Sequence, residues 1–380
     1  MMRGIKILKA SFGDGALDSS LMIKNHEKLR RALLWLPARL YELAVRLRVA
    51  AYETDYLEQR RLDATVISVG SLTLGGAGKT PMVEYIARYL SSEGHSVAVL
   101  TRGYARESSG MRVLNDPADG GGVGAAPSYR EFGDEPLMLA RALPDIPIIV
   151  NKRRFEAGRW AETQLGSDVL VLDDGYQHLA LSRDLNILLI DATDPLGGFE
   201  MPPFGRLREP LYGIKRADAI IITRADRPFD QGQTQGILKY YCGDKVPVMY
   251  FYSTITRLRH LATGEVYDAG DFAGWNVAVA CGIGNPKAFA EDILQVGISI
   301  VSESFFTDHH AFGQEDLDRI TRAAQGAGAD AIVTTEKDAV RLEGLTHGDV
   351  PVYAAQLEVQ SDDEVRLKSL LLRTVSVRKK

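Results

Sequence analysis

Cysteine is scarce in this chain of 380 residues. Only Cys242 and Cys281 occur, and neither a metal-binding nor a redox motif surrounds them. So few cysteines in a long chain exclude a scaffold built on disulfides and suit a reducing, cytoplasm-like compartment. The sequence also lacks a cluster of cysteine and histidine of the kind that holds structural zinc.

Long apolar runs and a strong excess of one charge are missing as well. No run of 18 apolar residues and no cleavable signal pattern occurs, so we expect neither a clear membrane-spanning helix nor a cleaved leader. The 45 basic and 50 acidic residues leave a net charge of −5, which argues against general nucleic-acid binding. Apolar content of 45% and charged content of 25% are those of a globular chain, whose length allows two or three domains.

The most informative stretch is a glycine-rich loop between a predicted strand and a predicted helix. The β-branched run 65–69 indicates a buried strand, and residues 81–90 place apolar side chains at helical spacing. The loop contains Gly75, Gly76, Ala77, Gly78, Lys79 and Thr80. Backbone N–H groups and a helix N-terminus would hold phosphates there, with Lys79 on the β- and γ-phosphates and Thr80 on Mg²⁺. The strict motif has glycine where this chain has Thr73.

Further apolar segments alternate with amphipathic ones along the next 150 or so residues. We expect strands at 96–100, 147–150, 168–172, 185–190 and 219–223. Strands that alternate with helices predict a mostly parallel sheet covered on both faces, and such sheets bind ligands at the carboxyl ends of their strands. Arg102, Asp173, Asp174 and Asp191 would fall at that edge, beside the phosphate loop.

Two adjacent carboxylates end one of these strands. Asp173 and Asp174 follow an apolar run, and like charges so close together repel each other unless a cation neutralises them. A phosphate-loop enzyme needs such a carboxylate to hold Mg²⁺, directly or through water. We therefore expect Thr80, Asp173 and Asp174 to form a metal site; two solvated aspartates in a turn are the plain alternative.

A second α/β unit follows a predicted hairpin. Residues 256–261 and 265–268 flank a Thr-Gly turn and indicate two strands. Strands are then expected at 276–281, 298–305 and 331–334. The predicted fold class is therefore α/β, with a mostly parallel sheet of the P-loop NTPase type and a second, Rossmann-like α/β half joined to it by a small β-hairpin linker.

The N-terminal segment has a different character. Residues 1–24 show no regular pattern, but five leucines in residues 28–52 recur at three- and four-residue steps and so share one helix face: Leu33, Leu36, Leu40, Leu43 and Leu47. Six basic residues stand against one acid, Glu42. Such a helix fits an anionic membrane surface, or it packs on the protein's own core with its basic face in solvent. Pro37 should begin or kink it.

Phosphoryl transfer to a hydroxyl also needs a group that orients or deprotonates the acceptor. The bare sequence offers Asp134, Asp191 and the neighbouring pair Asp308 and His309, and it ranks none of them first. Asp134 precedes a predicted helix, where it could equally serve as an N-cap.

Seven short motifs in a fixed order carry a resemblance to a known family. They are residues 69–81 around the phosphate loop, Thr-Arg-Gly-Tyr at 101–104, Gly-Asp-Glu-Pro at 133–136, Asp-Asp-Gly-Tyr-Gln-His at 173–178, Arg-Glu-Pro at 208–210, Asp-His-His at 308–310 and Thr-Glu-Lys-Asp at 335–338. Each is weak alone. Together, over about residues 28–345, they make the chain resemble the tetraacyldisaccharide 4′-kinase, or lipid A 4′-kinase, family, in which Thr73 is usual.

The resemblance implies a lipid kinase. Members of the family transfer phosphate from Mg-ATP to the 4′-hydroxyl of a tetraacylated glucosamine disaccharide 1-phosphate, which forms lipid IVA in lipid A (lipopolysaccharide) biosynthesis. They have two Rossmann-like halves joined by a β-linker, and an N-terminal helix holds them on the cytoplasmic face of the Gram-negative inner membrane. We accordingly expect ATP and Mg²⁺ as cofactors, the disaccharide and an anionic membrane surface as partners, peripheral or monotopic attachment, no nucleic acid and no obligate protein partner.

Carried over position by position, the resemblance also implies site residues. Lys79, Asp134 and His309 match catalytic positions, with Asp134 as the base, and Asp173 and Asp174 match the metal pair. Five further positions match polar active-site residues: Arg154, Gln177, His178, Arg208 and Glu209. The chain departs from the family in its longer lead, residues 1–24, and in an N-terminal helix more broken by arginines than a spanning helix would be.

We divide the chain into a tail and membrane-associating helix (1–56), a P-loop kinase core (57–255), a β-hairpin linker (256–270) and a C-terminal α/β half (271–380). Two other functions fit parts of the sequence. Residues 223–226, Thr-Arg-Ala-Asp, resemble the guanine motif of a P-loop GTPase, as in a GTPase or ATPase switch or a metallochaperone, although arginine replaces the usual lysine. An ATP-dependent membrane scaffold would need an inactive site, which the intact Lys79 and Asp173 oppose.

Overall fold

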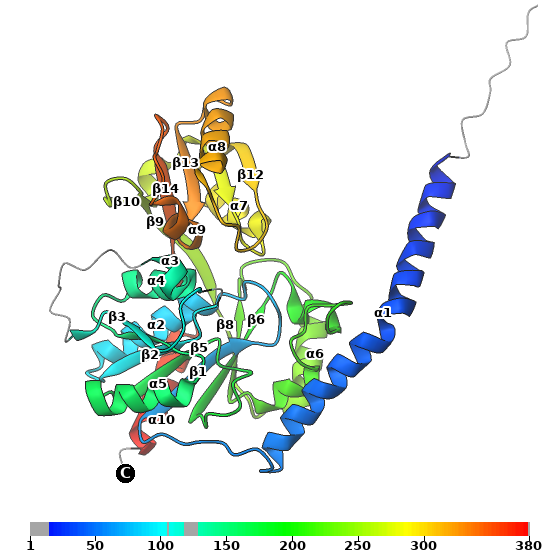
Figure 1. The fold of residues 1–380 in the computed structure, drawn as a ribbon, viewed down its shortest axis with the longest axis vertical. Coiled ribbons are helices and arrows are strands. Elements are labelled where there is room, and N and C mark those ends of the chain that lie inside the picture. The colour runs from blue at the N-terminus through cyan, green and yellow to red at the C-terminus, as the bar shows by residue number, and fades with distance from the viewer. Residues whose placement is uncertain (1–14, 105, 118–127, 379–380) are drawn as a thin grey trace, which may run out of the picture.

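The structure is a computed structural model that describes residues 15–104, 106–117 and 128–378, with the side chains of residues 15–33 outside that description. Two β-sheets with surrounding helices form the body, and a long N-terminal helix projects from it (Figure 1). The start of the irregular lead, residues 1–14, lies outside the described residues.

The first sheet has eight strands in the order β3-β4-β2-β5-β1-β6-β7-β8. Their bounds are β1 Thr65–Ser71, β2 Val97–Thr101, β3 Arg112–Leu114, β4 Ile148–Val150, β5 Val169–Asp173, β6 Leu185–Asp191, β7 Ala219–Thr223 and β8 Val248–Tyr250. Every neighbouring pair is parallel except β3 with β4. The central strands are buried along their whole length, because helices cover both faces, and their sequences are accordingly apolar throughout.

Helices α2 Lys79–Ser92, α3 Tyr129–Phe132, α4 Asp134–Ala142, α5 Arg154–Trp160, η2 Ala161–Leu165, η3 Pro195–Phe199, η4 Leu211–Arg216 and α6 Gln231–Cys242 belong to this half. The last helix, α10 Glu364–Arg378, also packs here, although it follows the second sheet in the chain. Its buried side chains Leu367, Leu371 and Val375 join the apolar cluster that includes α2 and β1. The chain therefore passes to the second half at β9 and returns after β14.

The second sheet has six strands in the order β10-β9-β14-β13-β11-β12. Their bounds are β9 Tyr252–His260, β10 Val266–Asp268, β11 Asn276–Cys281, β12 Ser299–Phe305, β13 Ala331–Thr335 and β14 Val352–Gln360, with η5 Ala269–Phe272, α7 Pro286–Gln295, α8 Gln314–Gly326 and α9 Glu336–Leu342 around them. The expected hairpin is present as the antiparallel pair β9 and β10, and β9 also pairs with β14. Two mostly parallel sheets confirm the predicted α/β class.

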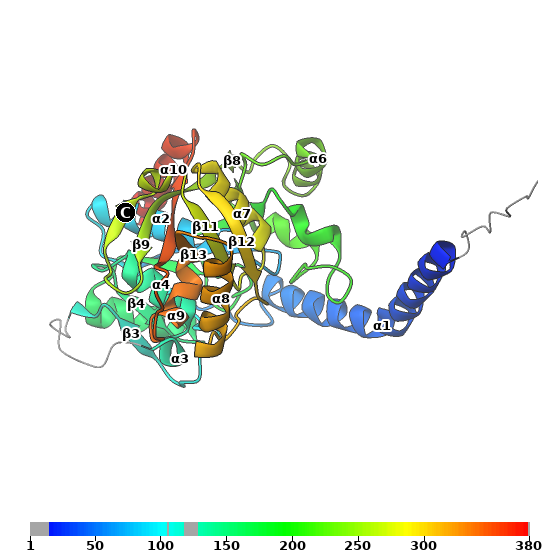
Figure 2. The same ribbon diagram turned by 90° about the horizontal axis from the view of Figure 1, so that it is seen from above.

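Helix α1 Gly15–Glu53 runs beyond both predicted ends. The expectation of irregular structure up to residue 24 is wrong for residues 15–24, whose alanine, leucine and methionine are good helix formers that extend a helix once it has formed. Pro37 lies inside the helix, which bends along its length (Figures 1 and 2). No helix in the described ranges combines the length and apolar content needed to cross a bilayer.

The leucine stripe of α1 points away from the body. Leu36, Leu40, Leu43 and Leu47 expose between 51% and 62% of their surface. Ala38 and Val49 are buried and Val45 packs on the apolar cluster below the helix; at 100° per residue these lie on the face opposite the leucines. Helix α1 therefore does pack on the protein's own core, but through the face opposite the leucines, and the described leucines of the stripe are not covered by the body.

Candidate active site

A cleft of about 1840 Å³ lies at the carboxyl ends of the first sheet's strands, between the two halves. The phosphate loop lines it from the first half; Gly284, His309 and Lys337 line it from the second. The halves meet beside the loop, where the Asn285 side-chain amide donates to Thr193 Oγ1 over 3.2 Å. Residues more than 200 positions apart in the chain therefore face one space.

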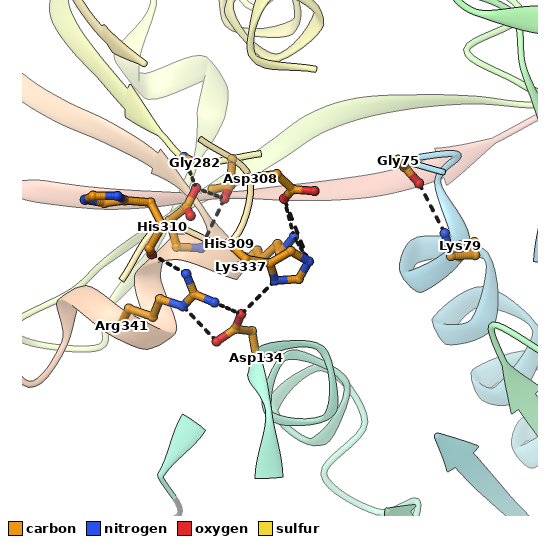
Figure 3. A network of polar contacts seen from close by, with 11 residues as sticks. Gly75, Lys79, Asp134, Gly282, Asp308, His309, His310, Lys337 and Arg341 are labelled. Carbon is orange, nitrogen blue, oxygen red and sulfur yellow. Dashed lines mark hydrogen bonds and ion pairs between the residues drawn. The ribbon is translucent and has the colours of Figure 1, made fainter. Parts of the chain in front are cut away.

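The phosphate loop connects β1 to α2. Gly75 and Gly78 have φ angles of 111° and 70°, a region that glycine enters without strain, and Gly78 is the N-cap of α2. Lys79 Nζ donates to the Gly75 carbonyl over 3.2 Å, so the ammonium folds back over the loop (Figure 3). Thr73, in place of a glycine, is buried and forms a β-bridge with Leu207.

Residues at the end of β7 hold the phosphate loop through hydrogen bonds to its carbonyl groups, supported by an ion pair with the end of β6. Arg224 Nη1 donates to the Gly76 carbonyl over 2.9 Å and is ion-paired to Asp191. The Thr223 hydroxyl donates to the Ala77 carbonyl over 3.2 Å. These contacts fix the Gly76 and Ala77 carbonyls and so orient the peptide groups of the loop for a phosphate, while the Ala77 N–H itself donates to the Gly75 carbonyl over 3.1 Å. Asp191, a candidate base in the sequence, is occupied in these contacts.

The two strand-end carboxylates differ in their surroundings. Asp173 is buried at the end of β5, where burial and then the Glu135 and Asp174 carboxylates raise its pKa to about 7, although the Thr101 hydroxyl donates to it over 2.9 Å. Burial also acts to raise the pKa of Asp174, but Lys79 and Arg208 outweigh it and lower that pKa. Arg208 Nη1 donates to Asp174 Oδ2 over 2.6 Å.

These residues fit a magnesium ion. Asp174 Oδ1 is buried, lies 3.8 Å from Lys79 Nζ and has no hydrogen-bond donor among the described residues. A hard cation would supply the missing charge to both carboxylates. In the described ranges no three His, Cys, Asp or Glu side chains cluster as a metal cage. Mg²⁺ is commonly held by one or two carboxylates together with substrate phosphates, so two aspartates and the Thr80 hydroxyl suffice.

Asp134 and His309 come together across the two halves. Asp134 begins α4, His309 follows β12, and His309 Nδ1 lies 3.4 Å from Asp134 Oδ2 (Figure 3). Burial would raise the pKa of Asp134, but hydrogen bonds from His309 and Arg341 outweigh it and hold that pKa below its usual value. Asp134 is 5% exposed, and His309 stands at the cleft wall beside it.

Two further cations surround this pair. Arg341 Nε donates to Asp134 Oδ1 over 2.9 Å and Arg341 Nη2 donates to Oδ2, while Lys337 Nζ lies 3.2 Å from His309 Nε2. The sequence motif at 335–338 includes Lys337, but the sequence alone gave no role to Lys337 or to Arg341. The available signal was their four-residue spacing, which places both side chains on one helix face.

The five polar positions divide into two groups. Gln177, Arg208 and Glu209 line the cleft, where Gln177 Nε2 donates to Glu209 Oε1 over 3.0 Å. Arg154 and His178 are not among the residues that line the cleft. Burial lowers the pKa of Arg154 to about 10, and burial with the nearby Arg154 and Arg183 lowers that of His178 to about 4, so His178 is neutral at pH 7.

Comparison with known proteins agrees with this geometry. The family model described as tetraacyldisaccharide-1-P 4′-kinase matches residues 30–376. The tetraacyldisaccharide 4′-kinase of Geobacter sulfurreducens is 39% identical over 352 residues, 90% of this chain and 93% of its own length. That of Pelobacter propionicus is 39% identical over 313 residues, 80% of this chain and 81% of its own.

A solved structure is similar over the same extent. The "apo" form of LpxK from Aquifex aeolicus in complex with ATP matches with a TM-score of 0.70 and 30% identity, covering 91% of this chain and 99% of its own. Similarity over nearly the whole chain favours a kinase over a GTPase switch, a metallochaperone or an inactive scaffold. The chain therefore belongs to the tetraacyldisaccharide-1-P 4′-kinase family.

Proposed function

We propose that this ATP-dependent kinase phosphorylates the 4′-hydroxyl of tetraacyldisaccharide 1-phosphate to form lipid IVA. The observation that carries the proposal is the single cleft that holds the phosphate loop, the strand-end aspartates and the His309 side of the Asp134–His309 pair. ATP would enter from the loop side and the acceptor sugar from the side of His309.

The nucleotide and metal are held by the first half. Gly75, Gly76, Ala77, Gly78, Lys79 and Thr80 would bind the phosphates, and Thr80, Asp173 and Asp174 would hold Mg²⁺. When bound, Mg²⁺ neutralises charge on the transferring phosphoryl group. Lys79 would add a second positive charge there, since its ammonium already lies over the loop at Gly75.

The proton of the acceptor hydroxyl passes to the Asp134–His309 pair. Asp134 is the proposed base, and its lowered pKa keeps it ionised at neutral pH. A weak base suffices, because in a loose transition state the hydroxyl proton leaves late and positioning dominates. His309 would act with Asp134 from the cleft wall, so the two should function as one unit.

The remaining polar positions support this centre. Arg208 would hold Asp174 in place through its 2.6 Å contact, and Gln177 with Glu209 would line the acceptor side of the cleft. Arg154 and His178 would act without lining the cleft, Arg154 by balancing the two aspartate charges.

Helix α1 would attach the kinase to the anionic cytoplasmic face of the bacterial inner membrane, as a peripheral or monotopic protein. Its leucine stripe is exposed, with Arg39 and Arg46 beside it. The opposite face contributes Tyr41 and Arg48 to the cleft wall. One helix would thus contact both the lipid surface and the site that receives the lipid. The division of the chain at residues 56, 255 and 270 is part of the same proposal, with α10 Glu364–Arg378 packed on the kinase core although it follows the C-terminal half in the chain.

The test is transfer of ³²P from γ-labelled ATP to purified tetraacyldisaccharide 1-phosphate. Wild type should label the lipid in a Mg²⁺-dependent manner, and Asp134→Asn should serve as the matched inactive control. Release of inorganic phosphate without labelled lipid would contradict the proposal and favour a nucleotide switch.

A further inference from the structure

The Thr-Glu-Lys-Asp motif at 335–338 is built into the turn between β13 and α9. The Thr335 hydroxyl oxygen caps α9 by accepting from the Asp338 N–H over 3.2 Å. Asp338 is 1% exposed and accepts from the Gly282 N–H over 3.0 Å. The Gly282 carbonyl in turn accepts from the His309 N–H over 3.1 Å. The start of α9 and the backbone of His309 are therefore both hydrogen-bonded to Gly282 (Figure 3).

Helix α9 carries two cationic side chains, Lys337 and Arg341, that reach the proton-accepting pair. Arg341 contacts both oxygens of Asp134 and donates to the His310 carbonyl, and the Arg341 and Asp134 side chains are 6% and 5% exposed. Lys337 Nζ donates to Asp308 Oδ1 over 2.8 Å and approaches His309 Nε2 at 3.2 Å. One helix face of the second half thus contacts both members of the proton-accepting pair.

The contact with Lys337 also determines which ring nitrogen of His309 carries the proton. An ammonium group can only donate hydrogen bonds, so the Nε2 that it approaches must accept and carries no hydrogen. Nδ1 then carries the proton and points it at Asp134 Oδ2, 3.4 Å away. Without Lys337 the ring could adopt the other tautomer, which would leave two acceptors facing each other.

We propose that Arg341 and Lys337 are positioning residues for the phosphoryl transfer: Arg341 holds the Asp134 carboxylate across the two halves, and Lys337 holds the ring and tautomer of His309. The inference rests on the proposed roles of Asp134 and His309. Neither cation is assigned contact with substrate.

Electrostatics supports the assignment of Arg341. The charged and titratable groups near Asp134 are Arg341 on α9, His309 after β12 with Lys337 and Asp308 behind it, and Glu135 next to it on α4. Burial acts to raise the pKa of Asp134, and the hydrogen bonds from His309 and Arg341 reverse that. If Arg341 is removed, burial remains, the Asp134 pKa rises, and less of the base is ionised at a given pH.

The test compares Arg341→Ala and Arg341→Lys with Arg141→Ala. Arg141 is the matched control because it joins α4 to Glu343, the C-cap residue of α9, at 2.8 Å, and its partner in that contact is not Asp134. We expect Arg341→Ala to lower kcat about 10- to 100-fold, which is the cost of losing an outer-shell group that orients a metal ligand, because Arg341 orients Asp134 in the same way. The acid limb of its kcat–pH profile should move to higher pH, KM values should change little, and added guanidinium should restore part of the rate.

Arg141→Ala should stay near wild type, and Arg341→Lys should recover part of the loss, because it keeps the charge but not the two-pronged contact. Equal losses in Arg341→Ala and Arg141→Ala, or a wild-type kcat–pH profile in Arg341→Ala, would overturn the proposal. If Arg341→Ala does not fold, an unchanged kcat and pH profile in Arg341→Lys would overturn it instead.

Lys337 is tested by a double-variant comparison. Lys337→Met should lower kcat in the wild-type background and have no further effect in His309→Ala, since a positioning residue has nothing left to position. The same fold-loss in both backgrounds would overturn the role of Lys337. Wild type is assayed alongside: absence of labelled lipid there would refute the proposed function, whereas a normal wild type leaves each result to bear on the positioning residues alone.

Discussion

Replacing the leucine stripe of α1 with glutamine should release the kinase from membranes. The change is Leu36→Gln, Leu40→Gln, Leu43→Gln and Leu47→Gln together, on side chains that expose 51–62% of their surface. Glutamine has nearly the helix propensity of leucine, so α1 should remain helical. The buried face, with Ala38 and Val49, is untouched, so α1 should stay packed on the body.

The magnitude follows from the exposed fraction. Full burial of a leucine side chain is worth about 1.5–3 kcal/mol, so burying a little over half of it contributes roughly 1 kcal/mol. Four leucines then contribute roughly 4 kcal/mol, and at about 1.4 kcal/mol per tenfold the quadruple variant should bind vesicles on the order of a thousandfold more weakly.

Charge should contribute less than the leucines. A basic residue near an anionic surface is worth about 1 kcal/mol. Arg39 and Arg46 both pair with Glu42 at 2.6 Å, so the three together present one net positive charge. Arg39→Gln with Arg46→Gln removes two positive charges and leaves the negative charge of Glu42, so it should weaken binding by roughly 2 kcal/mol, or roughly 30-fold, and only on anionic vesicles.

The assay is flotation with vesicles that contain or lack anionic lipid. The control is Leu294→Gln on α7, a leucine of the same exposure, 54%, in the second half. The quadruple variant should also raise KM for the lipid acceptor while leaving KM for ATP unchanged. Wild-type flotation of the quadruple variant, or an equal loss in Leu294→Gln, would refute the assignment of α1 as the membrane contact.

Three further predictions concern the cleft. Lys79→Ala should lower the transfer rate by about 10²-fold or more with an unchanged melting temperature, because its charge acts on the transferring phosphate; near wild-type turnover would rule the assignment out. Asp173→Asn and Asp174→Asn should each raise the Mg²⁺ concentration needed for half-maximal rate, since an amide is a poorer ligand for a hard cation; an unchanged magnesium titration for both would reduce the pair to a turn. Asp134→Ala should lower kcat far more than it changes KM, His309→Ala should cost less, and the double variant should be no worse than the product of the two; an effect of Asp134→Ala on KM for ATP alone would move the base elsewhere.

Local chemistry explains which parts of the fold were predictable. Strand β1 and the loop through Gly78 are specified by β-branched residues and glycines next to one another, so their positions followed from the sequence. The exposed direction of the leucine stripe could not be predicted from the sequence, because a periodic apolar face has the same pattern whether protein or lipid covers it. The packing of α10 on the first half could not be predicted either, because it depends on contacts between segments that are distant in the chain.

The catalytic centre shows most clearly the difference between what local sequence predicts and what depends on contacts between distant segments. Sequence reasoning without the family resemblance could not rank Asp134 above Asp191, because each is an aspartate at the end or start of an element. The structure separates them by the cations they contact. Asp191 pairs with Arg224, 33 residues away and directly after the neighbouring strand β7, and together they hold the phosphate loop. Asp134 pairs with Arg341, 207 residues away in the other half, and shares its remaining contact with His309 at the cleft. The position of a carboxylate whose partners come from both halves depends on how the two halves are arranged. Local spacing in the sequence does not contain that arrangement, so the role of Asp134 could not be found from it.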